Sequence, residues 1–156
     1  MTNFQKFGYI IGQGRYHEEI IYSMALIYNV IKSRITTYLR PYHLTIGKLN
    51  ILLVIKHQAG IEGIKQIDIS HHLIVTPSNM TKMIDKLETD DLVLRNALSG
   101  DRRVNIVTLT EKGKQLIDDL WEGYNKILLE EINKLHQADQ KDLAHTLTSW
   151  LTQMMD

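Results

Sequence analysis

A run of short polar residues begins at Pro77, near the middle of the chain. If this run is helical, with roughly 100° between successive residues, its apolar side chains share one side and its polar side chains share the other. The apolar residues are Met80, Met83, Ile84 and Leu87. The polar residues are Ser78, Asn79, Thr81, Lys82, Asp85 and Lys86. Such hydroxyl, amide and ammonium groups can bond to base edges in a major groove, although an ordinary solvated face has the same composition.

A second polar group, Asp101, Arg102 and Arg103, follows Gly100 in a segment of turn-forming residues. Two guanidinium groups beside a carboxylate suit a narrow minor groove, where the negative potential of DNA is deepest. The alternative is structural, because aspartate forms turns and arginine at a strand edge discourages aggregation. Both interpretations require an exposed hairpin tip.

A helix that begins at Pro77 needs a partner helix to hold it. Residues 66–73 predict a short helix with Ile69 and Leu73 as its buried pair. Thr76 can cap the next helix with its hydroxyl group, and Pro77 can occupy the first helical position, where its missing N–H costs nothing. Two helices joined by a tight turn within about 25 residues have the spacing of a helix-turn-helix unit.

The segments around this unit predict further helices and a hairpin. Residues 92–97 and 103–109 have the pattern of two strands, joined by the Ser99-Gly100-Asp101 turn. Thr110 is expected to cap a long helix that extends to Leu135, and Asp139 to open a last one.

Two helices are expected before the helix-turn-helix unit. Over residues 15–39 apolar residues recur at intervals of three and four, and Pro41 ends that helix. Thr45 is expected to cap a second helix that ends near His57. Glycines within residues 1–14 predict a flexible leader. The fold class is therefore mainly α with a small β-hairpin wing.

Charge alone does not indicate the partner. The 156 residues have a formal net charge of zero. Residues 1–65 carry eight Lys and Arg against three Asp and Glu, residues 66–112 six against seven, and residues 113–156 four against eight. The basic excess lies outside the helix-turn-helix segment, so the case for nucleic-acid binding depends on pattern.

Three motifs carry a resemblance to a known family. They are V-T-P-S-N at residues 75–79, D-R-R at residues 101–103 and L-T-E-K-G at residues 109–113, with Leu87-Glu88, Leu92-Val93 and Arg95 between them. In order, spacing and flanking long helices, residues 15–155 resemble the multiple-antibiotic-resistance regulator (MarR) family of winged helix-turn-helix transcription regulators. Two departures stand out: Asp91 replaces a usual glycine, and Ile67 occupies a position that is more often polar.

The resemblance implies roles for the two polar groups. The major-groove residues would be Pro77, Ser78, Asn79, Thr81 and Lys82. In the wing, Asp101 would steady Arg103 in the minor groove while Arg102 meets phosphate. Further backbone contacts would come from Thr76, Lys86 and Arg95. Residues 15–156 would form one domain, with a DNA-binding lobe at residues 45–112 and dimerisation helices at residues 15–40 and 113–156.

The resemblance also implies a homodimer. The first and last two helices carry more apolar surface than a small winged core can cover, although part of it must pack within the chain. A twofold dimer would read a pseudo-palindromic operator in duplex DNA with half-sites about 34–36 Å apart. The interface candidates are Ile20, Ile21, Met24, Leu147, Trp150 and Leu151.

Members of this family typically release DNA when a small, often phenolic ligand binds between the dimerisation and DNA-binding parts. Residues at the end of the first long helix are candidates for such a site: Tyr38, Arg40, Tyr42 and His43. The alternative is that these side chains only anchor a loop by aromatic packing. The resemblance thus predicts a repressor released by a small-molecule effector.

Several other functions lack support. There is no nucleophile–base pairing, phosphate-binding glycine loop or metal signature, so we expect neither an enzyme nor a bound cofactor. The absence of cysteine excludes thiol-based sensing, and the seven histidines are scattered, which disfavours a metal-responsive regulator. With no secretory or membrane-spanning segment expected, the chain is predicted to be cytoplasmic. A winged-helix adaptor that binds protein instead of DNA is the remaining rival.

Overall fold

The computed structural model describes residues 14–60, 62–98 and 100–155, without the side chains of residues 101–103. The helices are α1 (Tyr16–Leu39), η2 (Arg40–Tyr42), α2 (Ile46–Gln58), α3 (Gln66–His72), α4 (Pro77–Thr89), α5 (Glu111–Ile132) and α6 (Gln137–Met155). The strands are β1 (Ile64–Lys65), β2 (Val93–Leu98) and β3 (Asp101–Leu109). Apart from Gly14, the leader predicted for residues 1–14 lies outside the described residues.

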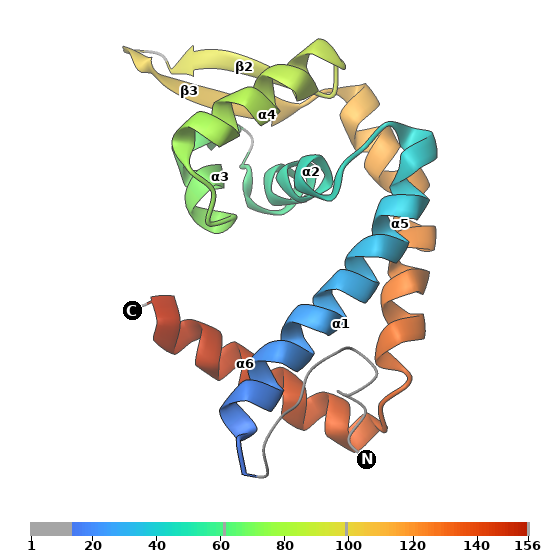
Figure 1. Ribbon diagram of the computed structural model, residues 1–156. Helices are drawn as coiled ribbons and strands as arrows, with labels where there is room; N and C mark the ends of the chain where they lie inside the picture. The colour runs from blue at the N-terminus through green and yellow to red at the C-terminus, as the bar shows by residue number, and fades with distance from the viewer. Residues whose placement is uncertain (1–13, 61, 99, 156) are drawn as a thin grey trace.

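The elements form two parts (Figure 1). In one part, α2, α3 and α4 pack with the sheet into a lobe. In the other, α1 and α5 lie side by side and extend away from this lobe, and α6 follows at their far end. None of the helices in the described ranges combines the length and apolar composition that a membrane crossing requires.

The hydrophobic core lies inside the lobe and at its junction with the helix pair. The residues buried there from α2 and α4 are Leu49, Ile51, Leu52, Ile55, Met80, Ile84 and Leu87. Of the long helices, α1 contributes buried residues only from its end, Ile35 and Leu39, and α5 contributes Ile117 and Leu120 from its first half. No described residue of α6 is buried.

The first two helices confirm the sequence prediction closely. The chain leaves α1 through a single 3-10 turn that contains Pro41. Thr45 caps α2, because its hydroxyl group accepts a hydrogen bond from the backbone N–H of Lys48 at 3.2 Å. This bond satisfies one of the N–H groups that a helix start leaves without an internal partner.

The helix-turn-helix unit forms as predicted, with one error of detail. Pro77 is the first residue of α4, but Thr76 does not cap this helix with its side chain. Its hydroxyl oxygen lies 3.5 Å from that of Ser78 instead, so the predicted cap is wrong. The turn before it contains Ile74, which is 71% exposed and has a φ of 52°, a rare conformation for a β-branched residue.

The wing is a three-stranded antiparallel sheet rather than a simple hairpin. Its order is β1-β3-β2, with Ile64 opposite Val107 and Val93 opposite Leu109. The predicted hairpin of β2 and β3 is confirmed. The sequence analysis missed β1 because two residues are too few to show the alternation that marks a strand.

The passage from α4 into β2 shows how the chain accommodates the missing glycine. Asp91 has a φ of 58°, so it adopts the left-handed conformation that its glycine counterpart would adopt more easily. Its N–H donates to the carbonyl of Glu88 at 2.9 Å. Ile67, the other departure, is 42% exposed on α3.

The last two helices begin almost where expected. Thr110 caps α5 by accepting a hydrogen bond from the N–H of Gly113 at 2.9 Å. A Cβ atom on Gly113 would lie 2.1 Å from the carbonyl oxygen of Leu92, so only glycine lets α5 pack this closely on the chain before β2. The helix ends at Ile132, before Leu135, and α6 begins at Gln137, two residues before Asp139.

Candidate nucleic-acid interface

The two sides of α4 have the burial that the sequence predicts. Met80, Ile84 and Leu87 are fully buried, and Met83 packs against the core. All the predicted major-groove residues are exposed: Pro77, Ser78, Asn79, Thr81 and Lys82. The polar side of α4 is therefore an accessible surface of the lobe.

The polar side chains on this surface differ in whether they already have hydrogen-bond partners within the protein. Within the described part of the chain, the side chains of Asn79 and Lys82 have no hydrogen-bond or ion-pair partner. Thr81 differs, because its hydroxyl group donates to the carbonyl of Pro77 at 3.1 Å and accepts from Nε2 of Gln66 at 2.9 Å. Asn79 and Lys82 thus keep their full bonding capacity for a ligand.

The wing lies on the same lobe as this surface. β2 packs against α4, and the β2–β3 hairpin runs back toward the end of the lobe where α4 begins (Figure 1). Asp101 to Arg103 belong to β3 beside a turn that includes Gly100, whose φ is 92°. The side chains of Asp101, Arg102 and Arg103 are outside the described part of the structure, so their predicted roles stay predictions.

Arg95 has a contact that the sequence analysis did not anticipate. Its guanidinium group bonds to Asp85 at 2.7 Å and to Glu88 at 3.0 Å, and these contacts tie β2 to α4. The two contacts leave other N–H donors of the guanidinium group unused, but a phosphate would have to share this charge with two carboxylates. The other two predicted backbone contacts, Thr76 and Lys86, are exposed.

A cavity of about 510 Å³ lies between the lobe and the helix pair. Of the four predicted ligand residues, Tyr42 and His43 line it, whereas Tyr38 and Arg40 do not. The remaining lining comes from the loop after η2, the end of α4 with the connection to β2, and the start of α5: Leu44, Thr89, Asp90, Leu92, Lys112, Gln115, Leu116 and Asp119. The cavity is thus built from both parts of the fold.

Tyr38 joins α1 to α5 instead of lining the cavity. Its hydroxyl group donates to the carbonyl of Leu120 at 2.8 Å, and its ring lies 5.6 Å from that of Tyr42. Burial, followed by the neighbouring Tyr42 hydroxyl, raises the pKa of Tyr38 to about 12. Tyr38 is therefore a neutral hydrogen-bond donor at physiological pH.

This packing predicts that Gly123→Ala destabilises the protein. A Cβ atom on Gly123 would lie 2.5 Å from the Tyr38 hydroxyl oxygen. Overpacking of this kind costs about 1–3 kcal/mol, partly offset by the ~1 kcal/mol that alanine gains over glycine in a helix. Urea unfolding should show a net loss of up to about 2 kcal/mol. In a Tyr38→Ala background the same change should stabilise; a stabilising effect in the wild type would contradict the prediction.

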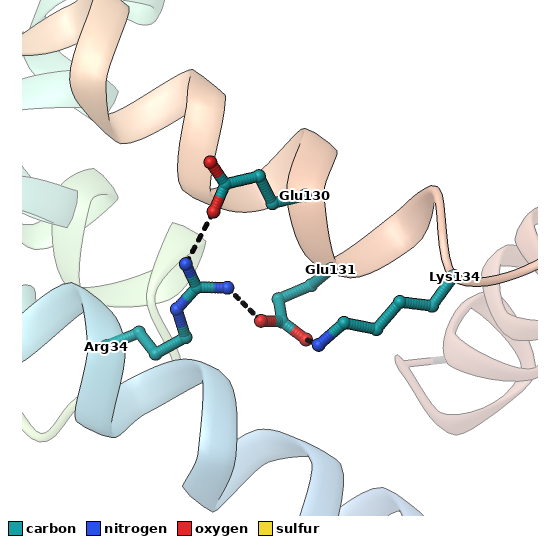
Figure 2. Close-up of polar contacts among 4 residues, drawn as sticks. All are labelled: Arg34, Glu130, Glu131 and Lys134. Carbon is teal, nitrogen blue, oxygen red and sulfur yellow. Dashed lines mark hydrogen bonds and ion pairs between the residues drawn. The ribbon is translucent and has the colours of Figure 1, made fainter.

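A polar cluster ties α1 to the last turn of α5 (Figure 2). Arg34 of α1 bonds to Glu130 at 2.5 Å and also to Glu131, and Lys134 bonds to Glu131 as well. Glu131 accepts hydrogen bonds from Lys134, which has the larger effect, and from Arg34. These bonds hold the pKa of Glu131 below its usual value. The sequence analysis did not identify this cluster, because Arg34 and Glu130 are 96 residues apart.

Beyond this cluster the structure leaves a large apolar surface uncovered. Ile20, Ile21 and Met24 of α1 are 43–51% exposed, and Leu147 and Leu151 of α6 are 38% and 56% exposed. Trp150 is half-buried. These residues are the six predicted interface candidates, and further exposed apolar residues lie on the same two helices: Tyr16, Ile27, Tyr28, Leu143 and Met154.

Comparison with solved structures defines the class of protein. The chain is similar to AbsC, a MarR family transcriptional regulator from Streptomyces coelicolor (TM-score 0.81, 18% identity, 93% of this chain and 98% of that one). It is also similar to a mutant MarR from E. coli complexed with operator DNA (TM-score 0.79, 19% identity, 90% and 99%). The fold is thus a MarR-like winged helix-turn-helix flanked by N- and C-terminal helices.

Sequence comparison identifies the family. The family model for the transcriptional regulator SarA/Rot matches residues 33–120, more than half of the chain. The protein therefore belongs to the MarR/SarA family of winged helix-turn-helix transcriptional regulators, which are not enzymes. One relative is the transcriptional regulator MhqR of Bacillus subtilis, 26% identical over 112 residues (72% of this chain, 75% of the relative). Another is SarZ of Staphylococcus aureus, 26% identical over 126 residues (81% and 82%).

Proposed function

We propose that this regulator is a homodimeric repressor that binds a pseudo-palindromic operator and leaves it when a small ligand binds. The observation that carries the proposal is the exposed polar side of α4, held outward by a fully buried apolar side. This is the geometry that a helix needs to lie in a major groove. The fold and family both support it.

In the proposed complex, the exposed residues of α4 contact bases and phosphates. The unpaired amide group of Asn79 suits adenine. The unpaired ammonium group of Lys82 suits guanine or a phosphate. Arg103 enters the minor groove with support from Asp101, and Arg102 meets phosphate. Arg95 keeps its carboxylate partners and, with Thr76 and Lys86, stays a candidate for contact with the DNA backbone.

The exposed apolar surface of α1 and α6 supports the homodimer. Large contiguous apolar patches are rare on soluble monomers, and they mark sites of association. In this chain both terminal helices expose several large apolar side chains, and both helices extend away from α4. Two copies joined there would each present an α4 to one half-site of a twofold operator.

The cavity at the junction supports release by a ligand. A ligand favours release only if it binds the non-DNA-binding arrangement of the lobes better than the DNA-binding one. The cavity at Tyr42 and His43 suits such discrimination because both parts of the fold line it. A protein of similar fold, CouR of Rhodococcus jostii, has been solved bound to p-coumaroyl-CoA, and we propose a small phenolic ligand for this chain.

Selection of bound duplexes from a random pool tests the proposal. We expect a pseudo-palindrome whose half-site centres are about 10 base pairs apart, or a multiple of that spacing. Binding to the selected duplex should weaken steeply as salt is added, because each neutralised phosphate releases a counterion. A protein adaptor would select no motif, and its apolar contacts would respond little to salt. Either result would contradict the proposed function.

A further inference from the structure

A hydrogen-bonded pair connects α3 to the outward side of α4. Gln66, the first residue of α3, donates from Nε2 to the hydroxyl oxygen of Thr81. Thr81 in turn donates to the carbonyl of Pro77, one helical turn before it. Thr81 is exposed, whereas the carbonyl oxygen of the Gln66 side chain is buried and has no partner in the described part of the chain.

The bond to Pro77 uses the only hydrogen of the Thr81 hydroxyl group, and the bond from Gln66 occupies one of its lone pairs. A threonine hydroxyl has one donor and two acceptor sites. If the Gln66 amide were turned over, its carbonyl would accept that hydrogen in place of the carbonyl of Pro77. In both arrangements Thr81 has no hydrogen to donate to a base. What it still offers a ligand is its methyl group and one oxygen lone pair.

The orientation of the Gln66 amide has its own physical reason. A buried polar atom without a partner is costly, and the carbonyl oxygen of Gln66 is such an atom. The reversed amide would bury an NH2 group with two unpaired hydrogens in the same place, which costs more. Gln66 thus holds the hydroxyl group of Thr81 from the protein side.

We propose that Thr81 recognises thymine through its methyl group and that Gln66 is the positioning residue that makes this contact selective. The inference rests on the proposed function, because it assumes that α4 lies in a major groove. The thymine C5-methyl group lines that groove, and a threonine methyl group is one of its apolar partners. Thr81 would then read a base by apolar contact, while Asn79 reads by hydrogen bonding.

Deoxyuridine scanning of the selected operator tests this inference. Each thymine of one half-site is replaced by deoxyuridine, which lacks only the methyl group, and the affinity of the full chain is measured by fluorescence anisotropy. For the wild type we expect a loss of about fourfold at one thymine, the effect of burying one methyl group. Thr81→Val, which removes the hydroxyl group but has a methyl group at both branch positions, should retain that loss without the bond to Gln66. Thr81→Ser, which removes the methyl group, should abolish it.

Two further variants complete the test. Gln66→Met keeps the side-chain length but removes one of the two bonds that hold the Thr81 hydroxyl group, so it should reduce the deoxyuridine effect at that thymine to less than about twofold. Thr152→Ser deletes a methyl group from α6, outside the DNA-binding lobe, and should leave the profile unchanged. Thr152 is a matched control because its hydroxyl group also donates to a carbonyl four residues before it.

The outcomes separate this inference from the proposed function. If the wild type binds a palindrome but shows no methyl effect, or if Thr81→Ser keeps the effect, the inference fails and the proposed function stands. An unchanged effect in Gln66→Met overturns the positioning role. If the wild type selects no duplex, the proposed function fails, and this inference fails with it.

Discussion

Leu147→Lys combined with Leu151→Lys should make the protein monomeric and lower its operator affinity by about 100-fold or more. Both leucines are exposed on α6, a helix that has no buried residue in the described structure. Two lysines on this side would have to be desolvated in a dimer, which is unfavourable without partners. A monomer binds one half-site at a time and loses the gain from joining two binding events. Analytical ultracentrifugation measures the oligomeric state, and fluorescence anisotropy measures the operator affinity.

The opposite side of α6 supplies the control for this prediction. His145→Lys combined with Ser149→Lys adds the same charge to the same helix, but at positions about half a turn away from Leu147 and Leu151. We expect this variant to remain dimeric and to bind the operator. A double leucine variant that stays dimeric at micromolar concentration would show that the exposed leucines are not at the interface.

Arg103→Ala should weaken operator binding by about 1–3 kcal/mol, as expected for one groove contact. The proposed reason is that the guanidinium group enters a narrow minor groove, where its charge meets the strongest negative potential. The loss should be larger on the selected operator than on a duplex of unrelated sequence. Anisotropy titrations with both duplexes at one fixed salt concentration provide the measurement.

Arg102→Ala is the comparison for this second prediction. This substitution removes the same charge from the neighbouring position. We assign the Arg102 side chain to a phosphate contact. Its loss should weaken binding to both duplexes about equally and reduce the salt dependence by roughly one released ion. Equal affinity of Arg103→Ala and the wild type for the operator would mean that the wing does not enter the groove.

The sequence predicted the fold well because most elements have a strong local signal. Thr45 and Thr110 cap their helices as expected, and the apolar positions of α4 are the buried ones. The same helical periodicity placed Ser78 and Asn79 on the accessible side. These features depend on residues three or four positions apart, which sequence patterns record directly.

The features that escaped prediction depend on residues far apart or on very short segments. β1 has two residues and forms only because β3 lies beside it. The ion pairs of Arg95 with Asp85 and Glu88 depend on how β2 packs on α4. Neither arrangement leaves a periodic mark in the sequence, so propensity and spacing could not reveal it.

The unbroken course of α5 has a mechanical consequence. Its 22 residues begin directly after β3 and span about 33 Å, ending at the cluster around Arg34. A rigid rod of this length works as a lever: a tilt of about 10° at one end displaces the other by roughly 6 Å, more than one turn of an α-helix rises. A rotation too small to disturb side-chain packing at the pivot would therefore carry the wing past more than one base pair.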